Sequence, residues 1–150
     1  MPKRRIVGSG SPWVKVISLL LCLLAGCFWR SYPRQAAAQA QLLMAMAHKE
    51  VDLVVGGQLT AENMPELTYP LERAGAFVKS ATQRAGEAPP ASLVALRALC
   101  ERYRVLLDTL DRVRRSERGE AALARLGVPL AEVDGAVAAV RRALAEEAAR

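Results

Sequence analysis

Apolar residues recur at spacings of three and four in four separate stretches of the chain, which is the period of an α-helix with one buried face. The pattern predicts helices over residues 35–55, 64–86, 90–118 and 129–148. Four amphipathic helices joined by short connections are typical of an antiparallel up-down-up-down four-helix bundle. We therefore expect residues 35–150 to form one all-α domain.

The third of these helices has the strongest periodic signal. Its expected buried positions are Leu93, Leu96, Cys100, Tyr103, Leu107 and Leu110. The corresponding positions of the fourth helix are Leu130, Val133, Val137, Val140, Leu144 and Ala148. No cysteine other than Cys100 follows residue 27, and at a core position its thiol pKa should be raised rather than lowered.

Proline and glycine residues mark the expected ends of the helices. Pro33 precedes the first helix, and Gly86 should end the second. Pro70 should kink the second helix or delay its start. Pro129 suits the first position of the last helix, after a short helical turn over residues 120–126.

A short apolar leader precedes these helices. Lys3, Arg4 and Arg5 make a basic start, an apolar stretch runs over residues 16–24, and two small residues follow it. This layout is typical of a secretory signal that is removed after export. The alternative is a permanent anchor, but the uncharged run from Val16 to Trp29 has fourteen residues, whereas a spanning helix needs about twenty.

The residues Leu24-Ala25-Gly26-Cys27 resemble the lipobox of bacterial lipoproteins. The resemblance covers residues 1–27 and implies a signal peptide over residues 1–26, cleaved before Cys27. It also implies that the Cys27 thiol takes up diacylglycerol and that the mature N-terminus is acylated, for example with palmitate. Phe28 stands where an Asp favours the inner membrane, so the resemblance implies a lipid anchor at the periplasmic face of the outer membrane.

Residues 27–34 would then form a membrane-proximal tether. Aromatic rings prefer the headgroup level of a bilayer, and guanidinium groups pair with lipid phosphates. The tether residues of these two kinds are Phe28, Trp29, Arg30, Tyr32 and Arg34.

The formal charge of +6 comes from 21 Lys and Arg residues against 15 Asp and Glu residues. Four of the cations precede Cys27 and no acidic residue does, so the chain from Cys27 onward carries only +2. A nearly balanced charge is unlike the basic surface of nucleic-acid-binding proteins. We therefore expect no nucleic-acid partner.

Glu50 is the most unusual polar residue of the expected bundle. It projects near the middle of the first helix's apolar face, with Gln39 on the same side. An unpaired carboxylate would be unfavourable there. One interpretation is an edge position or an internal pair with Arg104 or Arg141; the other is a polar spot where a partner or ligand docks.

Two further groups have both a structural and a functional interpretation. His48 and Asp52 lie one helical turn apart, as a metal-binding pair would, but the additional ligands of a metal site are not recognisable, and a solvated pair is favoured. Residues 112–118 contain four arginines that could meet an anionic surface. The neighbouring acids Asp111 and Glu117 favour a solvated helix end.

No catalytic, cofactor-binding or metal-binding motif is recognisable in the sequence. We therefore expect a non-enzymatic envelope lipoprotein that acts as a protein-binding or structural helical module. Pilotins, the lipoproteins that escort secretin subunits to the outer membrane, include small helical bundles of this architecture. The alternative is a periplasmic sensor or carrier of a small ligand held between the helices.

Overall fold

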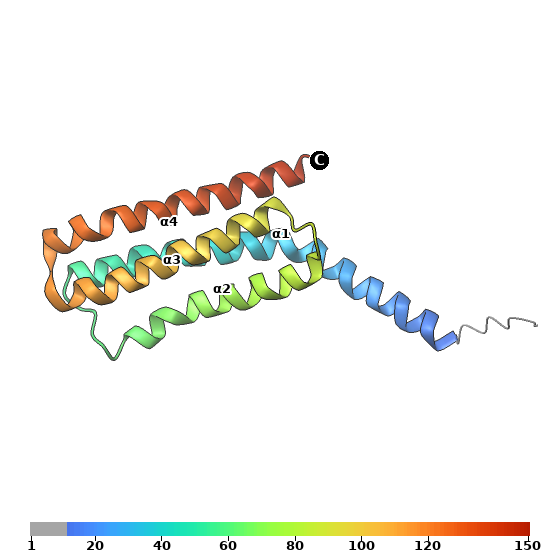
Figure 1. Ribbon diagram of the computed structural model, residues 1–150, viewed down its shortest axis with the longest axis horizontal. Helices are drawn as coiled ribbons and strands as arrows, with labels where there is room; N and C mark the ends of the chain where they lie inside the picture. The colour runs from blue at the N-terminus through green and yellow to red at the C-terminus, as the bar shows by residue number, and fades with distance from the viewer. Residues whose placement is uncertain (1–11) are drawn as a thin grey trace, which may run out of the picture. The chain divides into compact units, whose positions relative to one another are not determined.

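The computed structural model describes residues 12–150, which form four α-helices and, within that range, no strand (Figure 1). The helices are α1 (Pro12–Val55), α2 (Met64–Ala85), α3 (Ala91–Ser116) and α4 (Gly119–Ala148). The expected all-α class is confirmed. The chain divides into two compact units between Tyr32 and Pro33, and the helical bundle is the second of them, residues 33–150.

Polar contacts at the two ends of α3 define its direction relative to α4. Ser92, in the first turn of α3, bonds Glu147 near the end of α4. Glu117, which follows α3, pairs with Arg125 near the start of α4. The two helices are therefore antiparallel.

The bundle part of α1 is also antiparallel to α4. Gln41 lies beside Arg141, and His48, two turns further along α1, lies beside Asp134. Because α1 and α3 both run opposite to α4, they are parallel to each other. Figure 1 shows α2 beside α3 and running in the opposite direction, so that successive helices of the bundle alternate in direction.

The core is built on α3, whose expected buried positions are all confirmed. It presents Leu93, Leu96, Leu99, Cys100, Tyr103, Leu106, Leu107 and Leu110 to the interior. Of the positions expected in α4, Val133, Val137 and Val140 are buried, whereas Leu130 and Leu144 are only half-buried. The expectation for Ala148 is wrong, because its side chain is exposed. The preceding residue, Glu147, already lies beside the first turn of α3, so little of α3 remains to cover Ala148.

Two helices start earlier than their prolines suggest. The predicted start of the last helix at residue 129 is wrong, because α4 begins at Gly119 and Pro129 lies inside it. A helical proline removes one backbone hydrogen bond, but Ala122 and Leu126 before it are as deeply buried as Val133 after it. Packing on both sides therefore holds the helix together across the lost bond.

The first helix also starts earlier than its proline suggests. A start at residue 35 was expected, but α1 begins at Pro12 and continues through Pro33. In α2, Pro70 does not delay the start, which is at Met64. The connection from α3 to α4 consists of two residues, and it closes at Gly119 with a φ of 60°, a conformation that glycine adopts without strain.

Candidate functional site

A carboxylate is buried at the centre of the bundle, between α1 and α3. The Glu50 side chain is 0% exposed, and its Oε1 accepts a hydrogen bond of 2.6 Å from the Tyr103 hydroxyl. Its other oxygen, Oε2, is also buried and has no hydrogen-bond partner among the described residues. Glu50 therefore has one satisfied and one unsatisfied oxygen in an apolar interior.

This environment changes the protonation of both residues. Burial raises the pKa of Glu50 to about 7, although the Tyr103 hydrogen bond and the nearby Lys49 act in the opposite direction. Burial, together with the Glu50 carboxylate, also raises the pKa of Tyr103. Near neutral pH, Glu50 is thus a mixture of the acid and the carboxylate, while Tyr103 remains a hydrogen-bond donor.

The expected arginine partners of Glu50 are wrong. Arg104 pairs with Glu101 at 2.8 Å, and Arg141 donates a hydrogen bond to Gln41 at 3.0 Å. Both arginines are exposed on the edges of their helices, where the guanidinium group stays hydrated. The edge interpretation of Glu50 is wrong as well, because the residue is fully buried.

The true partner, Tyr103, was identified from the sequence as a core residue but was not matched with Glu50. A buried tyrosine hydroxyl normally needs a hydrogen-bond partner, and Glu50 was the one carboxylate expected on an apolar face. Matching these two groups would have been the usable signal. Gln39 does not join them, because it lies eleven residues before Glu50 and hence about 16 Å away along α1.

His48 pairs across the bundle rather than within its own helix. Its Nε2 lies 2.9 Å from Oδ1 of Asp134 on α4, so the expected pairing with Asp52 is wrong. Tertiary packing brings a carboxylate of another helix closer than the one a turn away. In the described part of the chain, no three metal-ligating side chains gather into one site.

Cys100 is buried, as its position in the periodic pattern predicts. Desolvation, together with the neighbouring Glu101, raises the pKa of its thiol to about 11. The sulfur is therefore a protonated, weakly nucleophilic group at neutral pH.

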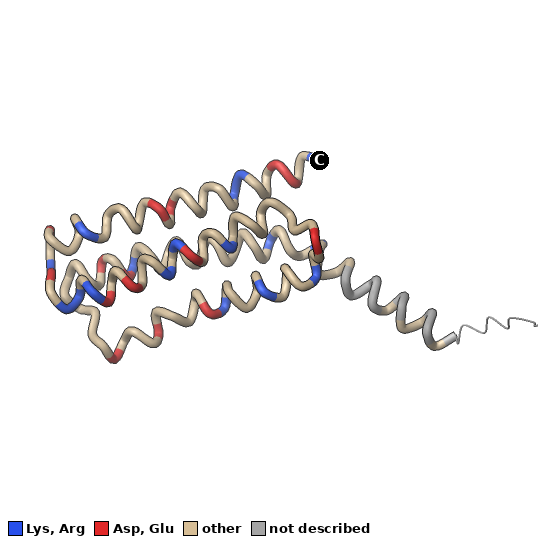
Figure 2. The backbone as a smooth tube through the Cα atoms, viewed as in Figure 1, with Lys and Arg blue, Asp and Glu red and all other residues tan. Residues whose placement is uncertain are grey.

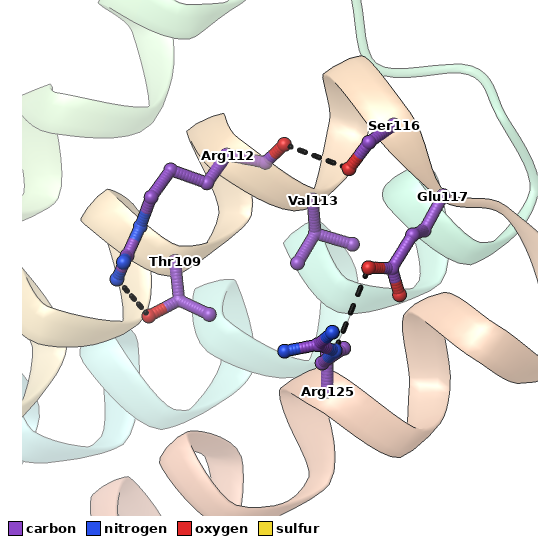
Figure 3. A pocket seen from close by; sticks show the side chains of 6 residues that line it. All are labelled: Thr109, Arg112, Val113, Ser116, Glu117 and Arg125. Carbon is purple, nitrogen blue, oxygen red and sulfur yellow. Dashed lines mark hydrogen bonds and ion pairs between the residues drawn. The ribbon is translucent and has the colours of Figure 1, made fainter.

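A polar cavity of about 280 Å³ lies where α3 meets α4, lined by Thr109, Arg112, Val113, Ser116, Glu117 and Arg125 (Figure 3). Its polar groups already have partners: Arg112 donates hydrogen bonds to the Thr109 hydroxyl and the Asp108 carbonyl, and Arg125 lies 3.5 Å from Glu117. Asp111 binds both Arg114 and Arg115 next to this cavity. Acids therefore accompany the arginines along this end of the bundle, as Figure 2 shows by the mixture of blue and red.

A second cavity, of about 350 Å³, is a groove between α2 and α3 that is open to solvent. We call it the α2–α3 groove; its lining residues are Gly75, Val78, Lys79, Thr82, Gln83, Arg97, Cys100, Glu101 and Arg104. Its exposed lining is mainly apolar. The spacing of apolar residues along the chain does not indicate this groove, because a groove depends on the distance between two helices.

The N-terminal unit carries the predicted lipidation site. The Cys27 thiol is free and exposed, and residues 24–27 are part of α1. The rings of Phe28, Trp29 and Tyr32 form a cluster: the centroid of Trp29 lies 5.3 Å from that of Phe28 and 5.1 Å from that of Tyr32, and Phe28 and Tyr32 are 6.2 Å apart. Phe28 and Trp29 are half-buried, and Tyr32 is buried. Arg30 and Arg34 are exposed.

The basic start of the predicted signal, Lys3 to Arg5, lies outside the described residues. Between residues 12 and 150, no helix combines the length and hydropathy of a membrane-spanning segment.

Comparisons with protein-family models, with curated proteins and with solved structures found no match to this chain.

Proposed function

We propose that the protein is a lipid-anchored bacterial envelope lipoprotein whose helical bundle acts as a non-catalytic module for binding another envelope protein. The observation that carries the binding part is the α2–α3 groove, an open depression whose exposed lining is mainly apolar. Exposed apolar surface of this kind is typical of protein interaction sites, and a groove between helices suits a helix or strand of a partner.

The anchoring part of the proposal rests on the sequence around Cys27. Cleavage before this cysteine would leave it as the first residue of the mature chain, six residues before the compact bundle unit begins at Pro33. A lipid on its exposed thiol would hold the bundle close to the membrane. The half-buried rings of Phe28 and Trp29 would then lie at the headgroup level, with Arg30 beside the phosphates, whereas the expected contribution of Tyr32 is wrong because its side chain is buried in the protein.

A carrier of a small ligand is the second candidate function. The observation that favours it is the buried Oε2 of Glu50, which no group in the described chain satisfies. Against it, Tyr103 already occupies the other oxygen, and Glu50 lines neither of the two cavities described above.

The first experiment is mass spectrometry of the N-terminal peptide from membrane-purified protein, alongside a Cys27→Ser variant. A peptide that begins at Cys27 and carries lipid, with the lipid lost in the variant, supports the anchored lipoprotein. An unmodified peptide that begins at Met1 contradicts it. Denaturing the purified protein and analysing the supernatant for a released small molecule tests the carrier alternative.

A further inference from the structure

The α2–α3 groove combines an apolar base with a positively charged rim. Lys79 projects from α2 and Arg97 from α3, and within residues 12–150 neither has a salt-bridge partner. Arg104 is balanced by Glu101 at 2.8 Å. The lining therefore carries a net charge of +2 that nothing in the described bundle neutralises.

The base of the groove contains a helical glycine that the bundle itself does not require. A Cβ built on Gly75 would meet no atom within 4 Å, so the internal packing leaves room for a larger residue. A glycine inside a helix lowers helix stability by about 1 kcal/mol relative to alanine. At this position it leaves bare backbone at the base of the groove, where another chain can approach closely.

Glycine alone does not define the site. Gly127 and Gly135 of α4 also have open space around their Cβ positions, but they line neither described cavity. The groove differs from these positions because the glycine, the apolar base and the unpaired cations occur together.

The dimensions indicate the kind of occupant. The lining spans Gly75–Gln83 on α2, which corresponds to about 12 Å, or roughly two turns of a helix. Sites for small molecules usually enclose most of the ligand surface, whereas this groove is open along one side. A segment of another protein needs only one of its faces covered, so the groove suits a protein segment better than a free amphiphile.

We infer that the α2–α3 groove is the docking site for an acidic amphipathic segment of a partner protein, with apolar side chains against Gly75 and Val78 and carboxylates beside Lys79 and Arg97. This inference rests on the proposed function, since it identifies where the partner binds. Opposite charges at the rim of an apolar contact align the partner and discriminate against segments of the wrong charge.

Photo-crosslinking in the source organism tests the inference on the full-length lipidated chain. A benzoylphenylalanine replaces Gln83 in the groove or, as a matched control, Ala138 on the exposed face of α4. The crosslinked peptide is then identified by mass spectrometry. We expect the probe at 83, and not the one at 138, to capture a segment in which acidic residues flank apolar ones at helical spacing.

Two sets of variants separate this docking from a chance contact. Gly75→Trp fills the groove, and Gly135→Trp makes the same change on α4. A Lys79→Glu/Arg97→Glu double variant reverses the rim. We expect Gly75→Trp and the double variant each to lower the crosslinking yield at position 83 by about tenfold or more. Gly135→Trp should leave that yield unchanged. Replacing the partner's acidic residues by lysine should restore crosslinking to the double variant. This rescue tests the inference even if Gly75→Trp does not fold.

Each other outcome overturns the inference. A lipid adduct at position 83 means an anionic amphiphile occupies the groove, and a self-adduct means a second copy of this chain. If the crosslinking yield at position 83 is unchanged in the Lys79→Glu/Arg97→Glu variant, the partner segment is not acidic. A partner captured only at 138 overturns the groove but leaves the proposed function standing. Capture at neither position overturns the groove as a docking site, while the lipid anchor is decided separately by the N-terminal peptide.

Discussion

The interfaces that α3 forms with its two antiparallel neighbours differ in how completely they are closed. Against α4, large side chains such as Leu126 fill the core, and polar contacts at Ser92 and Glu117 tie the two ends. Against α2, Leu67 and Pro70 are buried near the start of the helix, but the residues buried along the α2–α3 groove, Ala74, Val78 and Ala81, are small, and the groove remains open. One face of α3 therefore stabilises the domain, while the other keeps a surface on which a partner can dock.

The largest effect is expected from a cavity made in the core around α3. Leu96 is fully buried, so Leu96→Ala should lower the free energy of unfolding by about 2–5 kcal/mol. Urea denaturation measures this. The control is Val94→Ala on the same helix, where the side chain is 57% exposed and the change should stay within about 0.5 kcal/mol. Equal effects would mean that α3 is not the centre of the core.

The next largest effect concerns the pH dependence that Glu50 introduces. Its pKa rises from 4.5 to about 7 in the folded protein, so the folded state binds the proton more tightly than the unfolded chain does. Stability is therefore fully present below pH 4.5 and is lost as the pH rises through 7. The free energy of unfolding should fall by about 3 kcal/mol in total as the pH rises from 4.5 to above 7.

Glu50→Gln removes this ionisation and keeps an oxygen that can accept the Tyr103 hydrogen bond. We expect the variant to be more stable than the natural chain at pH 8 and similar to it at pH 5, as measured by thermal unfolding at both values. Glu101→Gln, at an exposed position on α3, is the control. If Glu50→Gln raised the thermal stability equally at pH 5 and pH 8, the result would contradict a buried carboxylate that ionises in this range.

A smaller effect is expected at the end of the α3–α4 interface. The Glu147 carboxylate accepts hydrogen bonds from both the backbone N–H and the hydroxyl of Ser92, at 2.8 and 2.7 Å. It therefore caps the first turn of α3 from another helix. Glu147→Gln should lose the charged component of this cap and Glu147→Ala the whole of it, at about 1–2 kcal/mol for the latter.

The neighbouring Glu146→Ala is the matched control, because that side chain is exposed on the same turn. Amide hydrogen exchange at the start of α3 should increase in Glu147→Ala only. No difference between the two variants would show that the ends of α3 and α4 are not held by this contact.

The smallest effect compares the glycine of the α2–α3 groove with an exposed glycine of α4. Gly75→Ala and Gly135→Ala should each stabilise the protein by about 0.5–1 kcal/mol, because both sites have space for a Cβ and alanine favours the helix. The thermal midpoint measures both. A destabilised Gly75→Ala would mean that α2 packs against α3 where the groove lies.

The periodic pattern alone determined much of this molecule. It located the four helices of the bundle and the buried seam of α3, because each helix hides one face and its apolar residues must repeat with the helical period. It also showed that Glu50 lies on an apolar face and that Cys100 is a core thiol. These are properties of single helices, which local spacing is sufficient to specify.

Only the tertiary structure decided the partners across helices. His48 meets Asp134 instead of Asp52, and Glu50 meets Tyr103 instead of an arginine, because such pairs depend on the relative axial position of two helices. Packing also overrode a local signal at Pro129, where burial on both sides offsets one missing hydrogen bond. The α2–α3 groove was decided in the same way, since it depends on the distance between two helices, which the spacing of residues along one helix does not specify.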